Sequence, residues 1–60
     1  MNLQRYIGKK IKIHANINGQ SINYTAFILE ADDDKVLFKD KFDVEVMIAA
    51  ENIESVEVVV

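Results

Sequence analysis

The sequence predicts a small all-β fold, a five-stranded and strongly bent antiparallel barrel, on three observations. Apolar and polar residues alternate over 10–16, and within 42–48 the apolar even positions alternate with Asp43, Glu45 and Met47, a period that places every second side chain on one face of a strand. Asn18-Gly19 is a hairpin signal, because both residues tolerate the positive φ of a tight turn. The segment 21–31 carries apolar side chains on both faces late in its length, which is typical of a long, bent barrel strand.

The N-terminal part is expected to hold one short helical turn and the first strand. The turn occupies the first six residues at most, with Asn2 as its cap and with Leu3 and Tyr6 facing inward. Gly8 marks the start of a strand over 9–17. The hairpin turn follows directly and leads into the second strand.

The second and third strands are predicted over 21–31 and 35–39. The small side chain of Ala26 is the expected bend in the longer strand. The three acids at 32–34 form the connecting turn, because aspartate favours turns by bonding its own backbone. A calcium loop would instead use alternate positions, a glycine and a distal bidentate glutamate, and that spacing is absent from the sequence.

The C-terminal part is expected to hold two further strands. Asp40-Lys41 makes a tight turn into a strand over 42–48. The segment 49–52 is too short for an α-helix and suits a single 3₁₀ turn. The final strand is predicted over 53–60.

The length of 60 residues predicts one domain over 1–60 with a small core. Such a chain buries only about 60% of its unfolded surface, so it gains from disulfides, metals or partner chains. There are no cysteines, which leaves association with other copies as the expected source of stability. No apolar run reaches membrane-spanning length and no signal peptide is visible, so we expect a cytoplasmic protein away from membranes.

No catalytic set is visible, so we expect neither enzyme activity nor a metal or other cofactor. Ser21 and Ser55 lack a nucleophile context. His14 is the only candidate general base, and it alternates with Ile13 and Ala15, so it is expected to face solvent or a neighbour.

The aromatic residues divide into expected core and expected surface. Phe27, Phe38 and Phe42 lie in apolar patterns and are predicted to pack in the core. Tyr24 is the most plausible exposed platform on which an RNA base would stack.

The final strand is rich in valine and lacks proline, which makes it an edge that pairs readily. We expect it to join the fourth strand of another copy, an arrangement that closes into a ring if the rotation permits. A frayed end in a monomer is the other interpretation. The candidate interface residues are Val44, Val46, Ile48, Val56, Val58, Val59 and Val60.

Four segments together resemble the Sm-like family, which includes the bacterial riboregulator Hfq. They are 6–13, the Asn18-Gly19 turn, 32–39 and 48–56. The resemblance spans about residues 6–58. It implies a five-stranded barrel, a ring joined through strands four and five, and RNA binding around the pore.

The chain departs from the family at the residues that would line the pore. Asp32 matches the family aspartate, but Asp34 stands where a stacking aromatic is usual and Val36 where other members have asparagine. Ala50 and Glu51 replace the Lys-His pair of the bacterial members, a change that repels phosphate. We therefore expect a degenerate pore site, with RNA held on another face.

The candidate RNA-binding residues are the N-terminal basic cluster and two outlying side chains: Arg5, Lys9, Lys10, Lys12, His14, Tyr24 and Lys39. Lys10, Lys12 and His14 are two apart and so share one strand face.

The alternative function is a small protein- or nucleotide-binding inhibitory or adaptor module with the same barrel, of the kind a phage or mobile element encodes. The net charge of −3 and the acidic segment 43–60 favour it. The basic segment 1–14 and this acidic one form either a solvated surface or a means of steering neighbouring copies together.

Overall fold

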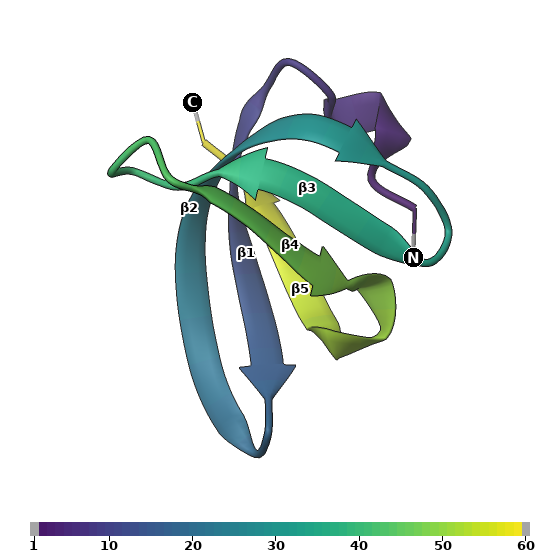
Figure 1. Cartoon of the computed structure of the whole chain (residues 1–60), viewed down its shortest axis with the longest axis vertical. Coiled ribbons are helices and arrows are strands. Elements are labelled where there is room, and N and C mark those ends of the chain that lie inside the picture. Colours follow the sequence, from purple (N-terminus) through teal and green to yellow (C-terminus); the bar gives the residue numbers. More distant parts are fainter. Residues whose placement is uncertain (1, 60) are drawn as a thin grey trace.

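The computed structural model describes residues 2–59 as one open sheet of five strands over one core (Figure 1). The elements in chain order are η1 (Gln4–Tyr6), β1 (Lys10–Ile17), β2 (Gln20–Ala31), β3 (Lys35–Lys39), β4 (Glu45–Ala49), η2 (Ala50–Asn52) and β5 (Ile53–Val58). The strand order is β4-β3-β2-β1-β5, and every pairing is antiparallel. The all-β class, the five strands and the 3₁₀ turn before the last strand are therefore confirmed.

The sheet is neither closed nor strongly curled, so the predicted closed barrel is wrong. Within residues 2–59, β4 pairs only with β3 and β5 only with β1, and each leaves one side open. Glycine kinks and β-bulges inside strands favour the curvature that closes a sheet. Here Gly8 and Gly19 both lie outside the strands, and the register shifts only near Leu29 and between His14 and Ala15.

The β1–β2 hairpin forms as the sequence predicts. Asn18 and Gly19 have φ values of 53° and 81°, the left-handed region that a two-residue hairpin turn requires. Ile17 pairs with Gln20 across the turn. β2 pairs with β1 along its first part and with β3 along its last part, as its course in Figure 1 shows. Its irregularity falls near Leu29, not at Ala26.

The predicted start of the fourth strand is wrong, because the loop before it is longer than a two-residue turn. The Asp40 carboxylate accepts hydrogen bonds from the backbone N–H of Phe42 at 2.8 Å and of Val44 at 3.0 Å. Asp43 adopts a φ of 63° in the same loop. These contacts hold the chain out of the sheet until Glu45.

The core lies on one face of the sheet, and Leu3, just before η1, packs into it. Ten buried apolar side chains form it: Leu3, Ile11, Ile13, Ala15, Ala26, Ile28, Val36, Phe38, Ile48 and Ile53. The predicted inward positions of Leu3 and Phe38 are confirmed. The N-cap of η1 is Leu3 rather than the predicted Asn2, although the Asn2 side-chain oxygen accepts a hydrogen bond from the Gln4 N–H at 2.8 Å. Phe27 and Phe42 are not core residues, since they are 43% and 73% exposed.

Candidate functional site

The basic residues of β1 lie on the face of the sheet opposite the core, called the outer face below. The burial of β1 alternates, with Lys10 and Lys12 exposed, His14 half-buried, and the residues between them buried. The prediction that these three side chains share one face is confirmed. Their role in RNA binding stays a prediction.

Strand β5 brings acids beside this basic strand. Lys12 is the direct cross-strand partner of Glu57. The ring of His14 lies between two oxygen acceptors, Asn23 Oδ1 at 2.6 Å from Nδ1 and Glu57 Oε1 at 3.2 Å from Nε2. A protonated ring, with two N–H donors, satisfies both contacts. The basic N-terminal and acidic C-terminal segments thus lie side by side in the sheet. This proximity makes β1 less suited to bind successive phosphates along its length.

Tyr24 does not form the exposed platform predicted for it. It is the cross-strand partner of Ile13, so it lies on the core face, away from the lysines. Its ring is half-buried and packs edge-on against Phe38, with centroids 5.1 Å apart and planes at 63°. The alternation of β2 places Tyr24 on the same face as the buried Ala26 and Ile28.

The other predicted RNA-binding residues are spread over three elements. Arg5 is exposed on η1, with its guanidinium carbon 4.9 Å from the centre of the Tyr6 ring. Lys9 is exposed just before β1. Lys39 ends β3, and its ammonium lies 3.4 Å from a carboxylate oxygen of Asp43.

One juxtaposition on the outer face is absent from the sequence-based predictions. Lys10 pairs with Phe27, and Phe27 pairs in turn with Lys39. Directly opposed residues in a sheet point to the same face, so an exposed aromatic ring lies between two lysines. The signal was present in the sequence, because Phe27 is out of phase with its buried neighbours Ala26 and Ile28.

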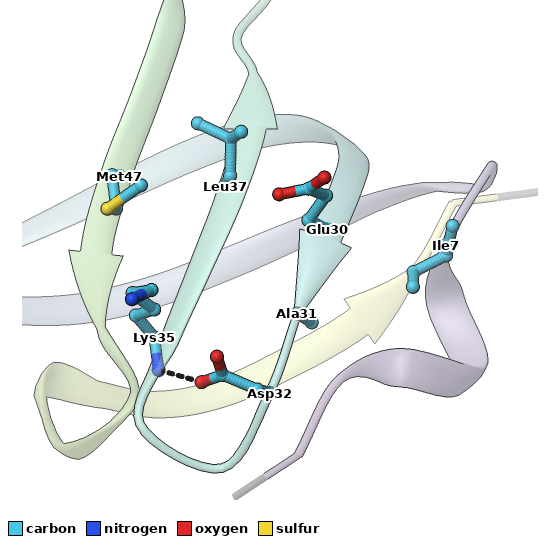
Figure 2. Close-up of a pocket in the computed structure, with 7 residues that line it drawn as sticks. All are labelled: Ile7, Glu30, Ala31, Asp32, Lys35, Leu37 and Met47. Atoms are coloured by element: carbon cyan, nitrogen blue, oxygen red, sulfur yellow. Dashed lines mark hydrogen bonds between the residues drawn. The ribbon is translucent and has the colours of Figure 1, made fainter.

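A shallow pocket of about 320 Å³ opens elsewhere on the outer face (Figure 2). Apolar side chains from four parts of the chain line it, together with two acids and a lysine: Ile7, Ala31, Leu37, Met47, Glu30, Asp32 and Lys35. Its mixed lining holds no group of three metal-ligating side chains, and none occurs among residues 2–59.

Asp32, one of the two acids that line this pocket, forms the turn predicted for 32–34. The carboxylate of Asp32 accepts hydrogen bonds from the N–H of Asp34 at 2.8 Å and of Lys35 at 2.9 Å. These backbone donors hold the pKa of Asp32 below its ordinary value of 3.8. The carbonyl of Asp34 accepts from the Ala50 N–H at 2.8 Å, which joins the two acidic loops. The turn prediction is confirmed.

The predicted interface residues occupy the two outermost strands and the residues flanking them. Val44 and Val58 are 55% and 58% exposed, and Val59 is 37% exposed. Val46 and Val56 are half-buried against the core, and Ile48 is buried. Val60 lies outside the described residues.

No protein-family model, curated protein or solved structure matches this chain. Among the described residues, no helix has the length and apolar character needed to cross a membrane.

Proposed function

We propose that this chain is an Sm-like subunit that assembles head to tail through β4 and β5, and that the assembly binds single-stranded RNA through a face other than the pore. The observation that carries the proposal is the strand order, which puts β4 and β5 at opposite edges of one sheet. A copy that adds its β5 edge to the β4 edge of another continues the sheet, and the same contact repeats. Such a heterologous contact gives a ring when the rotation closes.

The side chains at the two edges support this contact. On β4, Val46 and Ile48 face the core while Glu45 and Met47 face outward. On β5, Val56 continues the core face and is half-buried, while Val58, which pairs with the buried Ile11, is exposed. The core face therefore stays apolar up to both edges. A joined sheet would cover the apolar side chains that each subunit leaves partly exposed at these edges.

The acidic loops favour an RNA contact away from them. Four carboxylates lie on the connections β2–β3 and β4–β5, which the Asp34–Ala50 hydrogen bond holds together: Asp32, Asp33, Asp34 and Glu51. Phosphate is repelled there. Lysines lie instead on the outer face of β1 and at the end of β3, and repetition around an assembly multiplies a weak affinity for each site.

The alternative, a protein- or nucleotide-binding adaptor or inhibitory module, is favoured by a different observation. Large apolar side chains are exposed on the outer face and in the β3–β4 loop, with Met47 57%, Ile7 47% and Phe42 73% exposed. Ile7 and Met47 line the same pocket, and exposed apolar groups that gather in this way mark sites of protein interaction. The net charge of −3 suits a basic protein partner better than a phosphate chain.

Two measurements on the unmodified protein test the proposal. Native mass spectrometry and light scattering at micromolar concentration are expected to give a closed oligomer, and a monomer would refute the assembly. Fluorescence anisotropy with labelled oligo(U) and oligo(A) is expected to show binding that weakens steeply as salt rises. Absence of binding to both RNAs at low salt would remove the RNA function and leave the adaptor function.

A further inference from the structure

We propose that Lys10, Phe27 and Lys39 form the RNA contact of this protein, with a base stacked on the Phe27 ring and the flanking phosphates bound by the two ammonium groups. This inference rests on the proposed RNA-binding function and names its site. This row replaces Tyr24, Lys12 and His14 as the expected principal RNA contact.

The register of the sheet brings the three side chains together. Lys10 on β1, Phe27 on β2 and Lys39 on β3 are successive cross-strand partners, so they form one row across three adjacent strands. Strands lie about 4.8 Å apart, which separates the backbones of the two lysines by about 10 Å. Phe27 is the residue at which the pairing of β2 passes from β1 to β3, so it has a lysine on each side.

The exposure of the row suits a flat ligand. Phe27 is 43% exposed, although an aromatic ring gains by burial. An exposed ring accepts any base through stacking, without reading its hydrogen-bonding edge. Lysine binds phosphate as a compact charge on a flexible stem, and the stems allow both ammonium groups to follow a chain that crosses the ring.

The acids near the row lie beside Lys39, and they leave Lys10 and Phe27 available. No salt bridge includes Lys10 anywhere in the described range 2–59. Lys39 contacts Asp43 at 3.4 Å, but their side chains are 40% and 82% exposed, and such exposed pairs are weak. Glu45, the next residue in the row, limits the site on the β4 side. The RNA therefore crosses the row at β1, β2 and β3.

Lys12 and His14, further along β1, fit phosphate less well than Lys10 does. Glu57 is the cross-strand partner of Lys12 and contacts the ring of His14 at 3.2 Å. A phosphate there would meet a carboxylate on the same face of the sheet. This difference separates Lys10 from the other bases of β1.

The test measures RNA affinity for variants that change the row without adding charge. Phe27→Leu removes the ring but keeps an apolar side chain, and we expect about tenfold weaker binding with an unchanged salt slope. Phe27→Tyr keeps the ring and is expected to bind as the unmodified protein does. The double variant Lys10→Gln with Lys39→Gln is expected to make the slope of log K against log salt shallower by about 1.4, since each phosphate contact on a single strand contributes about 0.7.

Two matched controls lie outside the row. Phe42→Leu removes an exposed ring that also has a lysine near it, since the Lys41 ammonium is 5.3 Å from the ring centre. Lys35→Gln removes one positive charge at the other end of β3. Both are expected to leave the affinity and the salt slope within twofold of the unmodified values.

The outcomes separate this inference from the proposed function. Native mass spectrometry of each variant confirms that the oligomer is unchanged before affinities are compared. If the unmodified protein binds RNA while the Phe27→Leu and lysine variants match it, the row is refuted and the RNA function stands. Equal weakening by the two controls also refutes the row. If the unmodified protein binds no RNA at about 50 mM salt, the proposed function itself fails.

Discussion

A pair of complementary edge variants tests head-to-tail assembly directly. Val58→Lys adds a charge to the β5 edge and leaves β4 intact, whereas Val44→Lys adds a charge to the loop residue directly before β4 and leaves β5 intact. Both side chains are more than half exposed in the subunit, at 58% and 55%, so either substitution spares the core. We expect each variant alone to be monomeric and an equimolar mixture of the two to form a heterodimer and nothing larger.

The size of the effect follows from the area that each valine has left to bury. Full burial of a valine side chain contributes about 1.5 to 3 kcal/mol, so covering the exposed half contributes about 1 kcal/mol. Losing this burial alone raises the dissociation constant of each contact between subunits about fivefold. A lysine in the same place adds the cost of desolvating its charge, so the weakening at each contact exceeds tenfold.

The assay is native mass spectrometry of each variant and of the mixture, with circular dichroism to confirm that each remains folded. Gln4→Lys, which adds the same charge at an exposed position on η1, is the control and is expected to assemble normally. Heterodimers arise only if the β4 side of one copy binds the β5 side of another. Dimers of Val44→Lys alone would indicate pairing between two β5 edges, and that result would refute the proposed geometry.

Three further predictions concern the stability of the subunit. Asp32→Asn keeps an oxygen acceptor but not the charge. Because the folded pKa of Asp32 is lowered, the charge stabilises above the unfolded pKa of 3.8 and is lost as the pH falls through the lower folded value. In urea titrations, the free energy of unfolding of the unmodified protein should therefore exceed that of Asp32→Asn by less in acid than at neutral pH. A difference independent of pH would contradict this. Gly19→Ala places a Cβ at a φ of 81° and should cost about 1 kcal/mol in the same titrations; no loss would show that the turn relaxes. Phe38→Ala removes a fully buried ring and should cost about 3 to 5 kcal/mol, enough to unfold much of the protein, whereas Phe42→Ala should change stability by less than about 0.5 kcal/mol; equal losses would contradict the assigned core.

Local signals in the sequence predicted the elements well. The Asn18-Gly19 turn and the strand over 35–39 were placed correctly, because turn chemistry and alternation act over a few residues. The start of the fourth strand was wrong because the Asp40 side chain caps the loop at Phe42 and Val44, a contact that the apolar alternation of 42–48 does not report.

Longer-range features of the candidate site were harder to predict. The placement of Glu57 against Lys12 and His14 depends on β5 pairing with β1 across more than forty residues, and no local pattern encodes that register. Phe27 was assigned to the core from its apolar neighbours, although strict alternation from Ala26 and Ile28 already put it on the outer face. The apolar character of Phe27 favoured the core, whereas its position in the alternation of β2 favoured the outer face, and the structure agrees with the alternation.

The acids on both outermost strands have a consequence for the ionic conditions of assembly. Glu45 on β4 and Glu54 and Glu57 on β5 are exposed, so approaching copies repel one another, as charged edge residues do in proteins that resist uncontrolled polymerisation. If copies join through these edges as proposed, added salt screens this repulsion and favours assembly, and a contact whose rotation does not close gives an open filament. Phosphate binding responds to salt with the opposite sign. For the proposed RNA-binding assembly, ionic strength therefore acts in opposite directions on the association of subunits and on the RNA contact.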